Sequence, residues 1–162
     1  MLLAVDVGNS NITIGVFDGN SLVHTSRMTT GISRTSDEFG VFLVELMQMK
    51  GLTVDMITEV IVTSVVPDVM HSLTNGIKKY FKSNPLIVEP GIKTGINIAI
   101  PNPKQLGADR IVDAVAAYEI YGGPVIVIDY GTATSYQLVL EDGKLDSVVI
   151  APGIQTSVQA LT

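Results

Sequence analysis

The sequence lacks cysteine and tryptophan altogether and has few basic residues. Without cysteine there can be no disulfides or thiolate metal sites, which agrees with a reducing, cytoplasmic location. The 10 Lys and Arg against 16 Asp and Glu leave a net charge of −6, and the Lys and Arg form no cluster. We therefore expect no nucleic-acid surface. Apolar runs are too short to cross a membrane, and the start of the chain lacks the basic segment of a signal peptide.

The remaining composition is that of a folded protein with a substantial core. Of the 162 residues, 46% are hydrophobic and 16% are charged. Disordered chains have the opposite balance. The length corresponds to one ordinary domain, or to one domain and part of another.

Two stretches of the chain look like copies of one device. The first is Val5–Ile14 (VDVGNSNITI), and the second is Ile128–Gln137 (IDYGTATSYQ). In each, an apolar run ends in Asp-x-Gly, and a small polar cluster and a second strand-like run follow. An Asp-Gly pair then comes at Asp18-Gly19 and at Asp142-Gly143, which is a hairpin signal. Each copy therefore predicts a strand, a tight polar turn, a second strand and a hairpin.

The polar turns have the groups that a phosphate needs. They offer backbone N–H groups, short hydroxyl or amide side chains and one carboxylate, which suit a phosphate oxyanion with its metal ion. Such residues also build ordinary hairpin turns that bind nothing. Because the device occurs twice with a matching turn downstream, we favour two loops that hold one polyphosphate.

Hydrophobic periodicity and turn signals predict the other elements. Strands are expected at 2–7, 12–17, 21–28, 59–66, 86–88, 124–130 and 147–150. Thr35 and Glu38 have the spacing of a capping box before a helix, and Pro67 can open another. A further helix is predicted from about 105 to 121, and one begins at Ile154. The expected buried stripe of the 105–121 helix is Ile111, Val112, Val115, Ala116 and Ile120.

The order of these elements predicts an α/β fold. Three consecutive strands before a helical crossover indicate a mixed sheet with helices on its faces. The same opening then begins again after Gly122-Gly123. We therefore expect a first domain at 1–123 and the start of a duplicated second domain at 124–162, incomplete because it stops as its first helix begins.

The paired loops at 6–11 and 129–134 resemble the two phosphate motifs of the acetate/sugar kinase, Hsp70 and actin superfamily. Two further segments narrow this resemblance: Asn102–Arg110 (NPKQLGADR) between the loops, and Ile150–Ile154 (IAPGI) after the second. In this order and spacing, the set resembles the type III pantothenate kinase family over essentially the whole chain. Each motif alone is weak, but together they are specific.

The resemblance implies both a fold and an activity. The fold would be a duplicated ribonuclease-H-like, actin-like ATPase fold. The activity would be ATP-dependent phosphorylation of pantothenate to 4'-phosphopantothenate, the first step of coenzyme A biosynthesis. Family enzymes are homodimers that use ATP with Mg²⁺ and require a monovalent cation, K⁺ or NH₄⁺. They also continue well beyond the length of this chain, so we expect the 162 residues alone to be inactive.

The resemblance also carries roles onto individual residues. Asp109 matches the proton acceptor, Asp129 the monovalent-cation ligand and Thr132 an ATP contact of the second loop. Ile100 stands where some members have a tyrosine that contacts substrate. The substrate-binding stretch matches Gly107, Ala108, Asp109 and Arg110, and the first ATP loop matches Asp6, Val7, Gly8, Asn9, Ser10, Asn11, Ile12 and Thr13.

The residues themselves leave alternatives open. From its chemistry, Asp6 would face magnesium through water, because Mg²⁺ keeps much of its hydration. Asp109 could instead compensate the dipole in the first turn of a helix, and Asp129 could be a buried acid satisfied by backbone N–H groups. The whole chain could be another small-molecule kinase of the superfamily, or a non-catalytic regulator like Bvg accessory factor. The presence of Asp6, Asp109, Asp129 and Thr132 favours the enzyme.

Overall fold

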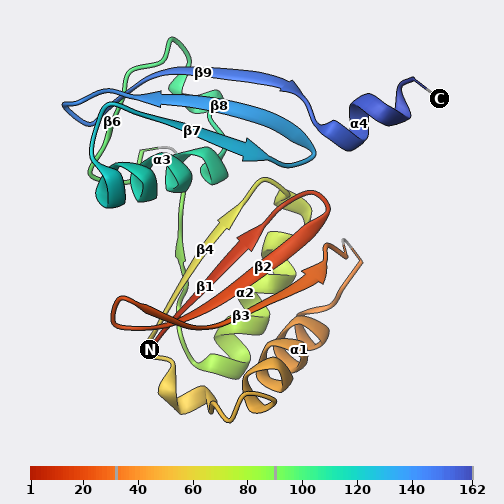
Figure 1. Cartoon of the computed structure of the whole chain (residues 1–162). Helices are drawn as coiled ribbons and strands as arrows, with labels where there is room; N and C mark the ends of the chain where they lie inside the picture. The colour runs from red at the N-terminus through yellow and green to blue at the C-terminus, as the bar shows by residue number, and fades with distance from the viewer. Residues whose placement is uncertain (32, 90, 162) are drawn as a thin grey trace. The chain divides into compact units, whose positions relative to one another are not determined.

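The computed structural model describes residues 1–31, 33–89 and 91–161, without the side chain at position 104 (Figure 1). The chain divides into two compact units, Met1–Val88 (unit 1) and Glu89–Thr162 (unit 2). This division precedes the domain boundary that we predicted after residue 123, because the last long helix packs on the second sheet. These compact units do not test the domains that we predicted at 1–123 and 124–162, which remain a prediction.

Unit 1 is a five-stranded mixed sheet with two helices. Its strand order is β3-β2-β1-β4-β5, in which β1, β2 and β3 are antiparallel neighbours while β4 and β5 run parallel to β1. This is the mixed sheet that the sequence predicted. The elements are β1 (Leu2–Val7), β2 (Asn11–Asp18), β3 (Ser21–Thr29), α1 (Ser36–Gln48), a 3₁₀ turn at Val54–Met56, β4 (Glu59–Ser64), α2 (Pro67–Phe81) and β5 (Leu86–Ile87).

The core of unit 1 lies between one face of this sheet and both helices. Residues at alternate positions of β1, such as Val5 and Val7, are buried against Phe39 of α1 and Leu73 of α2. The predicted capping box is confirmed at the start of α1, where Thr35 and Glu38 bond each other reciprocally. Both helices cover the same face, whereas we expected helices on both faces. Asp6, between Val5 and Val7, consequently lies on the face away from α1 and α2.

Unit 2 repeats the opening of unit 1. Its sheet has the order β6-β9-β8-β7, so β7, β8 and β9 are antiparallel neighbours in the same sequence as β1, β2 and β3. Both Asp-Gly pairs form the predicted hairpins (Figure 1). The elements are β6 (Asn97–Ile98), a 3₁₀ turn at Pro103–Gln105, α3 (Ala108–Tyr121), β7 (Val125–Tyr130), β8 (Ala133–Val139), β9 (Lys144–Pro152) and α4 (Ile154–Gln159).

Helix α3 presents a face that matches only part of the predicted stripe, since Ile111 is buried and Val115 packs against the same core. Ala108, Ile111 and Ala114 are its buried residues, whereas Ile120 is 69% exposed and Ala116 is also exposed. The apolar residues of this helix surround most of its circumference, so periodicity alone could not select the contacting stripe. Strand β6 was not predicted either, because two residues in a Gly- and Pro-rich segment carry no periodic signal.

Candidate phosphate loops and catalytic helix

The first predicted phosphate loop connects β1 to β2. The Gly8 N–H donates to the Asn11 carbonyl at 2.9 Å, and Thr30 fixes the loop from outside. The Thr30 hydroxyl donates to the Gly8 carbonyl at 2.6 Å, and its N–H donates to the Ser10 carbonyl at 3.0 Å. A Cβ at position 8 would lie 3.1 Å from the Asn11 carbonyl oxygen, so the turn has little room for a side chain. The loop is therefore held in one tight conformation.

The residues of this first loop divide into two groups. Val7 and Ile12 are buried in the core, so they anchor the loop and can offer a nucleotide only backbone atoms. Asp6 is exposed, on the sheet face away from the helices. The polar side chains at the tip, those of Asn9, Ser10 and Asn11, are exposed as well. This arrangement presents a carboxylate, a hydroxyl and two amides to solvent at the end of the sheet where β1 is connected to β2.

The second predicted loop connects β7 to β8 and is tied to the start of α4. The Gly131 N–H donates to the Ala133 carbonyl at 3.0 Å. The Thr132 carbonyl accepts from the Gly153 N–H at 3.2 Å and from the Thr156 hydroxyl at 3.0 Å. The Pro-Gly motif at the junction of β9 and α4 thus fixes the backbone of the second loop, a relationship that the sequence did not reveal.

The two loops differ in length by one residue. Asp6 pairs across the strands with Thr13, seven positions later, whereas Asp129 pairs with Ser135, six positions later. Both carboxylates lie near the end of the first strand of their copy. Asp6 is exposed, while Asp129 is half-buried on the sheet face that α3 covers. The loops are therefore related but present their carboxylates in different surroundings.

Asp109 lies in the first turn of α3, and its carboxylate folds back on the helix start. Its Oδ1 accepts a hydrogen bond from the Arg110 backbone N–H at 2.8 Å and lies 3.9 Å from the Arg110 guanidinium. The side chains of Asp109 and Arg110 are 29% and 18% exposed. A Cβ at position 107 would meet that same carboxylate oxygen, so a side chain there would require the Asp109 carboxylate to shift. The carboxylate thus has the position that favours a helix N-terminus electrostatically.

The direction of α3 brings three predicted site residues to one end of unit 2. The Tyr118 hydroxyl donates to the Glu141 carbonyl at 3.1 Å, so the last turn of α3 lies at the hairpin between β8 and β9. A 14-residue helix and a strand of six or seven residues both extend about 20 Å. The first turn of α3, with Asp109, therefore comes to the opposite end of the sheet, where Asp129 and Thr132 lie.

The other predicted site residues have structural surroundings. Ala108 is buried, and Gly107 caps α3 without a side chain. Ile100 packs against the core of unit 2, so its role in substrate binding remains a prediction. The first loop belongs to unit 1, and Asp109, Arg110, Asp129 and Thr132 belong to unit 2.

Sequence reasoning missed a group of buried polar side chains in unit 2. Gln137 is fully buried and Ser135 is 1% exposed, both on β8. Their polar side-chain atoms, and Nε of Arg110, have no hydrogen-bond partner among the described residues. The available signal was the strand alternation, which places Ser135 and Gln137 on the same face as Val139.

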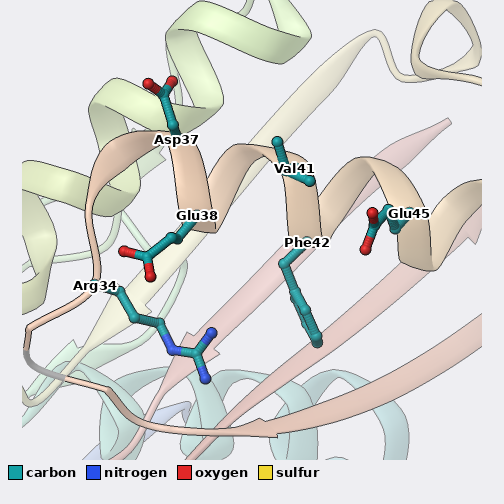
Figure 2. Close-up of a pocket in the computed structure, with 6 residues that line it drawn as sticks. All are labelled: Arg34, Asp37, Glu38, Val41, Phe42 and Glu45. Carbon is teal, nitrogen blue, oxygen red and sulfur yellow. The ribbon is translucent and has the colours of Figure 1, made fainter.

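An open hollow of about 390 Å³ lies along α1 and is separate from these residues (Figure 2). At the edge of this hollow, the Arg34 guanidinium lies 6.0 Å from the centre of the Phe42 ring. Hydrogen bonds from the backbone N–H and hydroxyl of Thr35 lower the pKa of Glu38. Hydrogen bonds from Lys79 and Tyr80 lower the pKa of Asp37. All six residues that line the hollow come from α1 or from the segment directly before it.

The part of the chain that the structure describes has no helix long and apolar enough to span a membrane. Within the same residues, no three His, Asp or Glu side chains gather in a group that could hold a metal ion.

Solved structures define the class of this fold. A Ppx/GppA phosphatase from Aquifex aeolicus matches with a TM-score of 0.55 at 15% identity, over 98% of this chain and 54% of that protein. A putative 2-dehydro-3-deoxygalactonokinase from Sinorhizobium meliloti matches with a TM-score of 0.56 at 13% identity, over 93% and 53%. These similarities establish the actin-like ATPase fold.

The sequence comparisons identify the family within this class. The family model described as type III pantothenate kinase matches residues 2–162, so the chain belongs to that family. A type III pantothenate kinase of Agathobacter rectalis is 58% identical over 99% of this chain, and one of Bifidobacterium longum is 48% identical over 99%. The chain spans only 62% and 63% of the lengths of these relatives.

Proposed function

We propose that the protein phosphorylates pantothenate with ATP, as the name of its family describes. The observation that supports this most directly is the arrangement within unit 2. A carboxylate at the start of α3, Asp109, lies at the same end of the sheet as the second Asp-x-Gly loop, with Asp129 and Thr132. Phosphoryl transfer depends on such positioning of a hydroxyl and on neutralisation of phosphate charge.

The first loop has the donors that a polyphosphate would need. Its exposed tip, Asn9 to Asn11, offers amide and hydroxyl groups, and Gly8 lets the backbone turn tightly without a side chain in the way. Asp6 has the exposure that a carboxylate needs to hold hydrated Mg²⁺. ATP bound with Mg²⁺ would supply the phosphoryl group, and the loop residues would orient its phosphates.

Asp109 is proposed to accept the proton of the attacking primary hydroxyl of pantothenate. Its Oδ1 is held by the Arg110 N–H, so the carboxylate has a fixed orientation. A carboxylate in this position acts mainly by orienting the hydroxyl, and Arg110 would attract the anionic parts of the substrates. Gly107 and Ala108 would line the same place with small residues.

Asp129 is proposed to bind the monovalent cation. It is half-buried, and the hydroxyl of Ser135 lies opposite it on the same face without a partner in the described residues. Oxygen donors of this kind suit K⁺, and an ammonium ion could donate to the same atoms. Thr132, three residues later, would contact the nucleotide from the second loop.

The wider setting follows from the family and belongs to the same proposal. The enzyme would be a cytoplasmic homodimer that works on pantothenate and ATP without nucleic acid or membrane. It would catalyse the first step of coenzyme A biosynthesis. Unit 2 offers an exposed apolar sheet face that such an assembly would cover, with Ile126 64% and Val149 60% exposed.

The decisive experiment is ADP release from ATP with pantothenate, Mg²⁺ and K⁺ or NH₄⁺. It should use the protein extended to the length of its relatives, with the 162-residue chain assayed beside it. We expect pantothenate-dependent turnover in the longer form. A panel of acetate, sugars and polyphosphate serves as the control. Turnover with one of these instead of pantothenate would favour another kinase of the superfamily, and turnover with none would favour a regulator.

A further inference from the structure

Unit 2 contains an unusual concentration of buried polar atoms without partners. Among the described residues, five buried side-chain nitrogen or oxygen atoms lack a hydrogen-bond partner, and four of them belong to Arg110, Ser135 and Gln137. An unsatisfied buried polar group costs about 1–3 kcal/mol. Gln137 alone has two donors and two acceptor positions to satisfy. Such groups are normally satisfied by something other than the chain, most often an internal water.

These residues belong to one small region of unit 2. Cross-strand pairing places Gln137 between Val127 and Val148 and places Ser135 between Asp129 and Ile150. Val148 packs with Ile111 of α3 in the core of the unit, so this face of the sheet is the one that α3 covers. Since the first turn of α3 lies at the Asp129 end, Arg110 projects from the helix turn nearest to Ser135.

The unpartnered atoms are also complementary in kind. Arg110 Nε can only donate, Gln137 Oε1 can only accept, and the Ser135 hydroxyl can do both. The Arg110 side chain is only 18% exposed, so bulk water does not fully solvate it. Among the described residues, the hydrogen bond that fixes the Asp109 carboxylate comes from the backbone N–H of Arg110 and not from its guanidinium. Apart from the 3.9 Å ion pair between the Arg110 guanidinium and Asp109, that Nε has no hydrogen-bond partner among the described residues.

We infer that Gln137 is a positioning residue for Arg110, acting through a water held in the buried polar space between α3 and β8. This water accepts from Arg110 Nε–H and donates to Gln137 Oε1, and the Gln137 amide nitrogen donates towards Ser135. The network holds the guanidinium at the start of α3, where it faces the anionic groups of the substrates. This last step rests on the proposed function, whereas the network itself does not.

The first test probes the hydrogen-bond network directly and does not depend on kinase activity. In the ¹⁵N-labelled 162-residue chain, we compare hydrogen exchange of Arg110 Nε–H with that of Arg27, which is exposed. Exchange at Arg110 should be at least about tenfold slower, and the Gln137 amide should show cross-relaxation with a long-lived water. Gln137→Met keeps the side-chain length without the amide and should abolish the protection. Gln137→Glu keeps an acceptor and should retain the protection of Arg110 Nε–H.

Two outcomes of this test would overturn the inference. One is unchanged protection of Arg110 in Gln137→Met. The other is an equal loss of that protection in Gln137→Glu, since an acceptor at position 137 would then contribute nothing to holding Arg110. Thr63→Val serves as the folding control, because Thr63 also has a buried unpartnered hydroxyl but lies in unit 1.

The second test uses the kinase assay on the longer form. Gln137→Met should raise the KM for pantothenate about tenfold, with kcat changed less than twofold, because Arg110 would be present but poorly oriented. Gln137→Glu should keep the KM for pantothenate near the wild-type value, because it keeps an acceptor at this position. An equal loss in both variants, entirely in kcat, would contradict a positioning role. If the wild-type protein had no activity with pantothenate, the proposed function would fail and the exchange experiment would still decide the inference.

Discussion

Gly153 lies directly against the carbonyl oxygen of Thr132, to which its N–H donates at 3.2 Å. A Cβ at position 153 would collide with that oxygen and with the carbonyl of Gly131. The φ angle of Gly153 is −65°, which any residue can adopt, so the requirement for glycine is one of space and not of backbone conformation. The Pro-Gly motif therefore supports the backbone of the loop that connects β7 to β8, the second predicted phosphate loop.

We predict that Gly153→Ala destabilises the protein by about 1–3 kcal/mol, the typical result of overpacking a tight contact. The loop backbone must move away from α4, so nucleotide affinity of the longer form should fall as well. Gly131→Ala is the matched control for stability, because its Cβ would be 3.4 Å from the nearest atom, an ordinary contact. Urea unfolding of both variants checks this, and equal stabilities would refute the steric argument.

Asp109→Asn should reduce kcat of the longer form by about 10²–10⁴-fold, the range typical of general acid–base groups. Asparagine keeps the side-chain oxygen that accepts from the Arg110 N–H, so α3 should still begin at the same residue. Circular dichroism and thermal unfolding provide the control for folding. Near-normal turnover in a folded variant would show that Asp109 only stabilises the first turn of α3.

Asp129→Ala should remove the activation of the enzyme by potassium. The reason is that Asp129 provides the charged oxygen beside the second loop, and no group of three or more acidic or histidine side chains in the described residues could replace it. Initial rates are measured at several potassium concentrations with ionic strength held constant by tetramethylammonium. Unchanged potassium activation in the variant would exclude Asp129 as the cation ligand.

The capping box of α1 should make stability depend on pH. Hydrogen bonds from Thr35 lower the pKa of Glu38 in the folded state. A carboxyl whose folded pKa is lowered contributes stability above its unfolded pKa and loses it as pH falls through the folded value. The melting temperature should therefore decrease between about pH 5 and pH 3. Glu38→Gln keeps a capping side chain without the charge and should decrease less steeply. Identical slopes would contradict the assignment.

The exposed face of the second sheet should cause self-association of the 162-residue chain. Ile128 and Tyr130, which flank Asp129, are 46% and 67% exposed. In the equivalent place of unit 1, Val5 and Val7 flank Asp6 and are buried by α1 and α2. Soluble monomers avoid exposed apolar patches of this kind.

Ile128→Lys should lower the average mass measured by light scattering over a range of concentrations. Leu22→Lys is its control, because Leu22 is a strand residue of unit 1 that is 55% exposed. It should leave association unchanged. A wild-type chain that stays monomeric at all concentrations would show that the exposed face does not associate.

Local patterns in the sequence were sufficient for most of the secondary structure and for the first account of the site. Each copy of the Asp-x-Gly device predicted its own strands and hairpin, because alternation and Asp-Gly turns act over a few residues. The capping box at Thr35 and Glu38 is equally local, and the structure confirms it. The roles of Asp109, Asp129 and Thr132 came from motif order alone and remain predictions to be tested by the variants above.

Only the tertiary structure decided features that depend on residues far apart in the chain. Strand β6 exists because Asn97 and Ile98 pair with Lys144 and Leu145 of β9, a contact without a local signal. The buried stripe of α3 depends on which sheet face it meets, and the sequence offered several apolar stripes. The burial of Gln137 likewise follows from the position of α3. Periodicity specifies which residues share a face, but packing between distant segments determines which face is covered.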